Sequence, residues 1–132
     1  MSPAMRGTLL RLVPVAAGVT LLAAWFATVE PDGRWVARNA VPPALVVVLS
    51  ALALVRGSGR WLGAGWRWPL GVAGFAVPAL GLSAYLHYAW LVDLDGMFSA
   101  GPGALFRYLP VYTSGAGAIG FAIGWLVGRN VN

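Results

Sequence analysis

The sequence contains no cysteine and only one histidine, and both features limit the chemistry that it supports. Without cysteine there are no disulfides, thiolate metal sites, iron–sulfur clusters or cysteine nucleophiles. A metal site needs three or four converging ligands, and bis-histidine haem ligation needs two histidines. We therefore expect no metal, no cofactor and no catalytic residue of these classes.

Charged residues are also scarce. They make up 10% of the 132 residues, whereas hydrophobic residues make up 59%, and the mean hydropathy is +0.75. A soluble domain carries about 25% charged residues, because water must hydrate its surface. The composition therefore predicts an all-α membrane protein with a single domain, residues 1–132.

Four long runs contain no charged residue. A helix that crosses the hydrocarbon core needs about 20 apolar residues, since the core is about 30 Å thick and each residue rises about 1.5 Å. The runs predict a four-transmembrane-helix bundle with short loops and spans at about 10–29, 39–56, 68–92 and 108–128. The first run lacks a small-x-small cleavage site, because Trp25 precedes Ala27, so we expect an uncleaved span.

The charged residues segregate between the two sides of this bundle. One side carries six arginines and no acid: Arg6, Arg11, Arg56, Arg60, Arg67 and Arg129. The other side carries three arginines and four acids: Arg34, Arg38, Arg107, Glu30, Asp32, Asp93 and Asp95. The positive-inside rule places the first side, with the N and C termini, in the cytoplasm.

The nine basic residues are all arginine, and the chain is rich in Ala, Gly, Val and Trp. This usage is typical of a high-GC bacterial genome, so we expect a multi-pass protein of the bacterial cytoplasmic (inner) membrane. The net charge of +5 does not predict nucleic-acid binding, because the arginines are spread between apolar runs and form no single basic stripe.

Small residues recur every four positions in the fourth span: Ala116, Gly120, Gly124 and Gly128. Such a stripe lets a neighbouring helix approach closely. The third span adds further small residues: Ala73, Ala76, Gly81 and Ala84. The stripe predicts helix packing, either within this chain or against another subunit or a second copy.

His87 is the one ionisable residue well inside a predicted span, about 6–9 Å below its outer boundary at helical rise. Ionisable groups at such depth are candidates for function. Ser83 lies one turn before it, and Asp93 and Asp95 follow the span. These four residues are the candidate polar site, and the alternative is a histidine that only forms a hydrogen bond in an interfacial aromatic belt.

The inner loop combines arginine with tryptophan at Arg60, Trp61, Trp66, Arg67 and Trp68. Indole rings favour the membrane interface, and guanidinium groups bind lipid phosphates. These residues predict interface anchors, with membrane lipids as partners and a specific anionic-lipid or protein site as the alternative.

Four spans in a short chain resemble the small multidrug-resistance transporters. Those proteins carry an essential acid inside the first span, and the first run here contains none. Proton-coupled export by that mechanism is therefore not expected.

Three hypotheses of function remain. The first is an accessory or scaffold subunit of a larger membrane complex, binding other subunits. The second is a homo-oligomeric channel or small-solute transporter, with His87, Ser83, Thr113 and Ser114 around a polar path. The third is an intramembrane enzyme acting on lipid, with His87 and the outer acids as its site.

Overall fold

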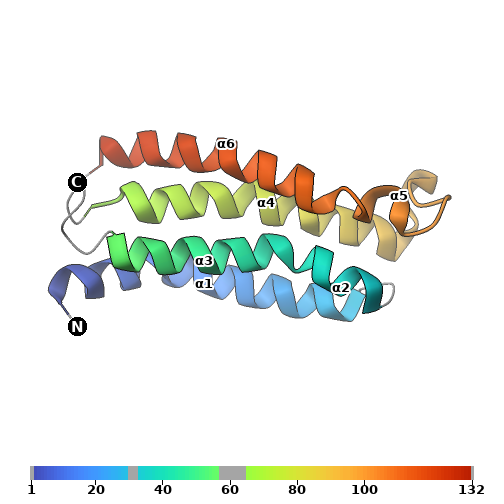
Figure 1. The fold of residues 1–132 in the computed structure, drawn as a ribbon, viewed down its shortest axis with the longest axis horizontal. Coiled ribbons are helices and arrows are strands. Elements are labelled where there is room, and N and C mark those ends of the chain that lie inside the picture. Colours follow the sequence, from blue (N-terminus) through green and yellow to red (C-terminus); the bar gives the residue numbers. More distant parts are fainter. Residues whose placement is uncertain (1, 30–32, 57–64, 132) are drawn as a thin grey trace.

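The computed structural model describes residues 2–29, 33–56 and 65–131, which form helices joined by turns. Four segments are long and apolar enough to cross a membrane: Pro3–Val29, Gly33–Arg56, Arg67–Val92 and Leu109–Arg129. They alternate in direction, so both termini lie at the same end of the bundle (Figure 1). We call this the terminal end and the opposite one the far end. The predicted all-helical architecture with four candidate spans is confirmed.

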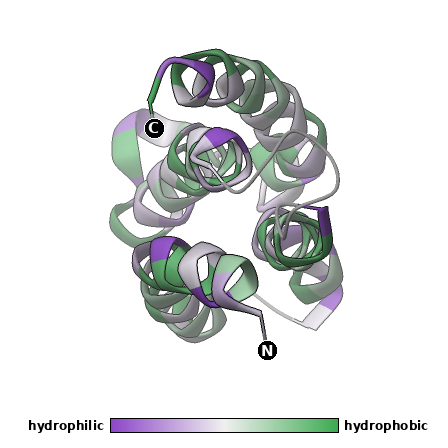
Figure 2. Ribbon diagram, turned by 90° about the vertical axis from the view of Figure 1, so that its left-hand side faces the viewer, coloured by the Kyte–Doolittle hydropathy of each residue, from purple (hydrophilic) through white to green (hydrophobic). Residues whose placement is uncertain are grey.

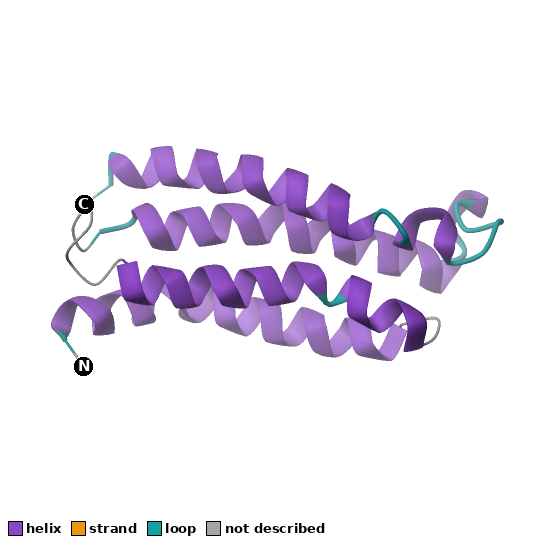
Figure 3. Ribbon diagram, viewed as in Figure 1, coloured by secondary structure: helices purple, strands orange, loops and turns teal. Residues whose placement is uncertain are grey.

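The first candidate span is α1 (Pro3–Val29), the third is α4 (Arg67–Val92) and the fourth is α6 (Leu109–Arg129). Figure 3 shows that helices account for nearly all of the described structure. The second span consists of α2 (Gly33–Asn39) and α3 (Val41–Arg56). The connection from α4 to α6 contains the short 3-10 helix η1 (Leu94–Gly96) and α5 (Gly103–Phe106).

Two helical segments extend beyond the predicted spans at their starts. The first helix begins at Pro3 instead of about residue 10, and the second span begins at Gly33 instead of 39. Arginine is a good helix former, so a helix can continue past the arginines that end an apolar run. The third and fourth spans begin and end within about one residue of the predicted bounds.

The second span is interrupted at Ala40, between α2 and α3. Pro42 and Pro43 follow after Val41 and have no backbone N–H, so they cannot donate to the carbonyls of the preceding turn. The flanking bonds still form: the Ala40 N–H donates to the Val36 carbonyl at 2.9 Å, and the Ala44 N–H donates to the Ala40 carbonyl at 2.9 Å. The two helices therefore continue in one direction as a single span.

Helix α4 is the centre of the bundle and packs against α1, α3 and α6, whereas α6 packs mainly on α4. One apolar core, with Leu12, Val46 and Val72 among its members, extends from the terminal end to Phe26, near the far end of α1. A second core forms around Phe106 and Leu109 at the far end. Seen along the bundle, apolar residues recur on all of the long helices (Figure 2), and many of the large apolar side chains are exposed.

Glycine from both helices forms the crossing of α4 and α6. A Cβ at Gly120 would collide with the Gly74 carbonyl oxygen, and one at Gly124 would collide with the Leu70 carbonyl oxygen. A Cβ at Gly128 would lie 2.6 Å from the Trp66 carbonyl oxygen. These backbones approach so closely only because glycine has no side chain.

The first residue of the predicted small-residue stripe, Ala116, is less buried than its neighbour Gly117. Ala116 is partly exposed, whereas the neighbouring Gly117 is buried, and a Cβ there would lie 2.6 Å from the Phe75 ring. The face of α6 that contacts α4 therefore runs through Gly117, Gly120, Gly124 and Gly128. It is used within the chain.

Candidate functional site

His87 lies inside the bundle and is fully buried. Its Nδ1 is 2.7 Å from the carbonyl oxygen of Ser83, one turn earlier in α4. Because a carbonyl oxygen only accepts, Nδ1 carries the proton and donates, which leaves Nε2 as the acceptor. The side-chain nitrogen of Asn39 lies 3.5 Å from Nε2 and is the donor to it. The ring is thus held in one tautomer by groups from α4 and α2.

Aromatic rings surround this imidazole. The Phe26 ring of α1 stacks on it with centroids 4.2 Å apart and an interplanar angle of 12°. The Phe106 and Trp25 centroids lie 5.2 Å and 6.3 Å away. Phe106 is itself buried and lies 4.9 Å from Phe98. The rings separate the imidazole from the surface, so the site is closed in this conformation.

The neighbouring tyrosines have a different environment. Tyr85 and Tyr88 are 48% and 50% exposed and face outward, whereas His87 faces the bundle interior. The tyrosines and the histidine therefore do not form one aromatic belt, as the sequence interpretation had grouped them. The tyrosines lie on the surface, and the histidine forms hydrogen bonds within the core.

Two other polar side chains of the candidate path are also buried. The backbone of Ser83 accepts the His87 hydrogen bond, while its Oγ has no hydrogen-bond partner among the described residues. Thr113 donates to the Leu109 carbonyl of its own helix at 2.6 Å. Ser114 is partly exposed. The structure therefore joins Ser83 to His87 and leaves the Thr113 hydroxyl bonded within α6.

Asn39 is a site residue that the sequence reasoning missed. It is 1% exposed and lies 48 positions before His87 in the chain. The available signal was an amide side chain at the start of an otherwise apolar run. Its partner could not be named from sequence, because the contact joins two different spans.

Asp93 and Asp95 lie apart from His87. Both are exposed and follow the end of α4, with φ of 51° in the left-handed region that Asp tolerates. The Asp93 N–H donates to the Trp90 carbonyl at 3.4 Å and helps to end the helix. Because His87 is buried, the structure does not bring the carboxylates and the imidazole into one site. Across residues 2–29, 33–56 and 65–131, no three potential metal-ligating side chains gather.

The predicted interface anchors fall into two groups. Arg60 and Trp61 lie outside the described residues. Trp66, Arg67 and Trp68 lie at the start of α4, at the terminal end, and all three are partly exposed.

Arg11 of α1 meets the first of these tryptophans. Its guanidinium carbon lies 4.9 Å from the Trp66 ring centroid, within the range of a cation–π contact. Its Nη1 donates to the Gly65 carbonyl oxygen at 3.3 Å. Trp68, in contrast, turns toward α6 and lies edge-on to Trp125 at 5.1 Å, with its indole N–H buried.

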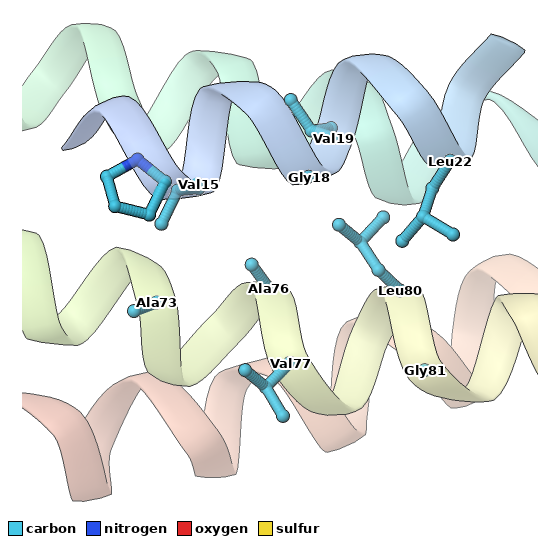
Figure 4. A pocket seen from close by; sticks show the side chains of 10 residues that line it. Val15, Gly18, Val19, Leu22, Ala73, Ala76, Val77, Leu80 and Gly81 are labelled. Carbon is cyan, nitrogen blue, oxygen red and sulfur yellow. The ribbon is translucent and has the colours of Figure 1, made fainter.

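A groove of about 470 Å³ lies between α1 and α4 (Figure 4). Its walls are the segments Pro14–Leu22 of α1 and Ala73–Gly81 of α4, and every residue that lines it is apolar. Gly18 and Gly81 face open space, because a Cβ at either position would meet nothing within 4 Å. The groove is separate from the His87 site, and none of the predicted site residues lines it.

Comparison of the chain with protein-family models, with curated proteins and with solved structures gives no match.

Proposed function

We propose that this protein is an accessory or scaffold subunit of a larger membrane complex. It is inserted through its four spans in the bacterial cytoplasmic membrane, with both termini in the cytoplasm. The observation that carries the proposal is the contrast between a closed interior and an extensive apolar exterior.

The interior is blocked at two levels. From the terminal end to the middle, the described core is mainly apolar, with Leu12, Val46 and Val72 at 4%, 0% and 0% exposure. The one buried polar side chain near that end, Thr8, donates its hydroxyl to the Ala4 carbonyl of its own helix among the described residues. Toward the far end, His87 and Ser83 are both fully buried, and aromatic rings lie around the His87 imidazole. A solute crossing the monomer would meet both barriers, which favours a function exerted through the outer surface.

The outer surface is apolar on every span. The exposed fractions are 71% for Leu21 of α1, 67% for Val55 of α3, 74% for Val77 of α4 and 66% for Ile119 of α6. Large apolar surfaces of this kind contact lipid or other membrane helices. Helix α6 packs mainly on α4, so its opposite face is open along its length.

The charge distribution supports the proposed orientation. Arg6, Arg11, Arg56, Arg67 and Arg129 lie at the terminal end. The described acids, Asp93 and Asp95, lie at the far end. By the positive-inside rule, the terminal end faces the cytoplasm.

Because the natural chain has no cysteine, single cysteines give unique cross-linking sites. We would introduce them at Ile119, Leu21 and Val55, with the buried Val72 as the matched control. Tagged protein from the host would be cross-linked in native membranes, purified in mild detergent and measured by native mass spectrometry. The proposal would be supported if a cysteine at one outward position cross-links to other proteins in a fixed ratio and the cysteine at Val72 cross-links to none. A monomer bound to no other protein at all three positions would contradict it.

The second candidate is a homo-oligomeric channel or small-solute transporter. It is favoured by the buried polar groups of Asn39, Ser83 and His87, which are unusual in so apolar a bundle. The same purification would then give a homo-oligomer, and ion flux in liposomes would change in His87→Ala. A wild-type protein without flux would exclude this alternative.

A further inference from the structure

We propose that the groove between α1 and α4 binds one acyl chain of an anionic phospholipid, with the lipid phosphate at Arg11. This inference does not depend on the accessory function, but it does require that the four helices span a bilayer. It follows from the lining, the length and the ends of the groove.

The lining is suited to a hydrocarbon chain. The groove holds about 470 Å³ and has no polar side chain along its walls. Gly18 lies on the side of α1 that faces α4 and has no side chain to fill the groove (Figure 4), and Gly81 of α4 also lines it. A flexible apolar chain gains dispersion contacts there without leaving any hydrogen-bonding group unsatisfied.

The charged end of the groove lies at the terminal end. Arg11 precedes Val15, Gly18 and Leu22 by four, seven and eleven residues, so all four lie on one face of α1. Trp66 stands in the same relation to Ala73 and Val77 on α4. The contact of Arg11 with Trp66 therefore lies at the mouth of the groove.

Arg11 has the chemistry for a phosphate. Guanidinium has five N–H donors and pairs with phosphate through two parallel bonds, and the bond to Gly65 uses one donor. Trp66 supports the guanidinium from its ring face at 4.9 Å. A cation with an adjacent indole is the usual composition of the headgroup region.

The length of the groove distinguishes a lipid chain from a partner helix. The lined part of α1, from Pro14 to Leu22, rises about 12 Å. With Arg11 at its mouth the site is about 16 Å long, close to one leaflet of a hydrocarbon core about 30 Å thick. The lining on α1 ends at Leu22, and the next large side chains of that helix, Trp25 and Phe26, pack around His87. A transmembrane partner would need a surface through both leaflets, whereas one acyl chain needs only this half.

The test uses the full chain, purified in detergent and depleted of lipid. It would be titrated with palmitoyl-oleoyl phosphatidylglycerol or palmitoyl-oleoyl phosphatidylcholine and followed by native mass spectrometry. We expect the first phosphatidylglycerol to bind about fivefold more tightly than phosphatidylcholine, the effect typical of one interfacial arginine. Arg11→Gln should abolish this preference, whereas Arg129→Gln, at the same end but on α6, should keep it.

The apolar part is tested separately. Gly18→Leu and Gly81→Leu add a side chain at two lining positions where a Cβ meets nothing within 4 Å, and they should weaken binding of both lipids. Gly115→Leu is the matched control, because Gly115 also faces open space but lies on α6. Thermal melting followed by circular dichroism verifies that each variant is folded. Gly81→Leu lies far from Arg11, so it tests the apolar lining independently of the phosphate end.

Three results would overturn the proposal. The first is equal affinity of the wild-type protein for the two lipids. The second is unchanged lipid binding in both Gly18→Leu and Gly81→Leu. The third is a co-purifying protein that Gly18→Leu removes while lipid binding stays the same, which would assign the groove to a protein partner.

Discussion

Replacing Gly124 with alanine tests the close crossing of α4 and α6. The new Cβ would collide with the Leu70 carbonyl oxygen and would lie 2.7 Å from the Leu70 carbonyl carbon. Non-bonded carbons are most stable at about 3.5–4.0 Å, so the two helices must separate by about 1 Å. A gap of about 1 Å loses up to about half of the dispersion energy of the contacts that face it.

The expected magnitude follows from two opposing effects. Overpacking of this kind costs about 1–3 kcal/mol. The higher helix propensity of alanine offsets at most about 1 kcal/mol of that cost. We therefore expect Gly124→Ala to lower the free energy of unfolding by about 1–2 kcal/mol, and Gly124→Leu to lower it further.

Equilibrium unfolding by sodium dodecyl sulfate in mixed micelles measures this free energy. Near-ultraviolet circular dichroism is a suitable signal, because Trp68 and Trp125 meet edge-on at 5.1 Å beside the crossing. Gly115→Ala is the matched control on the same helix, since a Cβ there meets nothing within 4 Å. If Gly124→Ala and Gly115→Ala were equally stable, the proposed close backbone contact would be refuted.

Three further variants test other parts of the core. His87→Ala removes the ring stacked in the core and should lower the free energy of unfolding by about 2–4 kcal/mol. His87→Phe keeps a ring and should lower it by about 1–2 kcal/mol. Equal losses in detergent unfolding would contradict the role of stacking. Gly117→Ala should lower the free energy of unfolding, because the new Cβ meets the Phe75 ring. In a double-mutant cycle this loss should be much smaller in a Phe75→Leu background. An equal loss in both backgrounds would rule out the ring as the obstacle. Thr113→Val should change the unfolding free energy by less than about 1 kcal/mol, because the hydroxyl bonds, among the described residues, to backbone carbonyls of its own helix. A loss above about 2 kcal/mol would show a role beyond these bonds.

The number of candidate spans could be predicted from the sequence because it depends on one property, the length of apolar runs. The starts of the first two helices could not be predicted in this way. Arg6 and Arg11 end the first apolar run, yet they lie inside α1, and Arg34 and Arg38 lie inside α2. Helix propensity and apolarity are different properties, because arginine favours a helix although it is charged.

The candidate site could be predicted only in part. His87 was identified because an ionisable group in an apolar span is rare. Its bond to Ser83 is local and follows from the spacing of one helical turn. Its contacts with Asn39 and Phe26 join different spans, and a single sequence contains no information on which residues of two helices meet.

The small residues of α4 also show that a single sequence does not identify which helix faces meet. The spacing argument selected Ala73, Ala76, Gly81 and Ala84, whereas the crossing with α6 uses Gly71 and Gly74. Helix α4 carries small residues on more than one face, so spacing alone does not identify the face that a partner will cover.

Glycine has opposite consequences on the two sides of α4. Against α6, Gly74 lies opposite Gly120, so neither helix has a side chain in the way and the backbones meet. Against α1, Gly18 and Gly81 are flanked by larger side chains, such as Val19 and Leu80, which hold the two helices apart. Glycine therefore closes an interface when the opposing residue is also glycine, and it leaves a groove when neighbouring side chains set the distance.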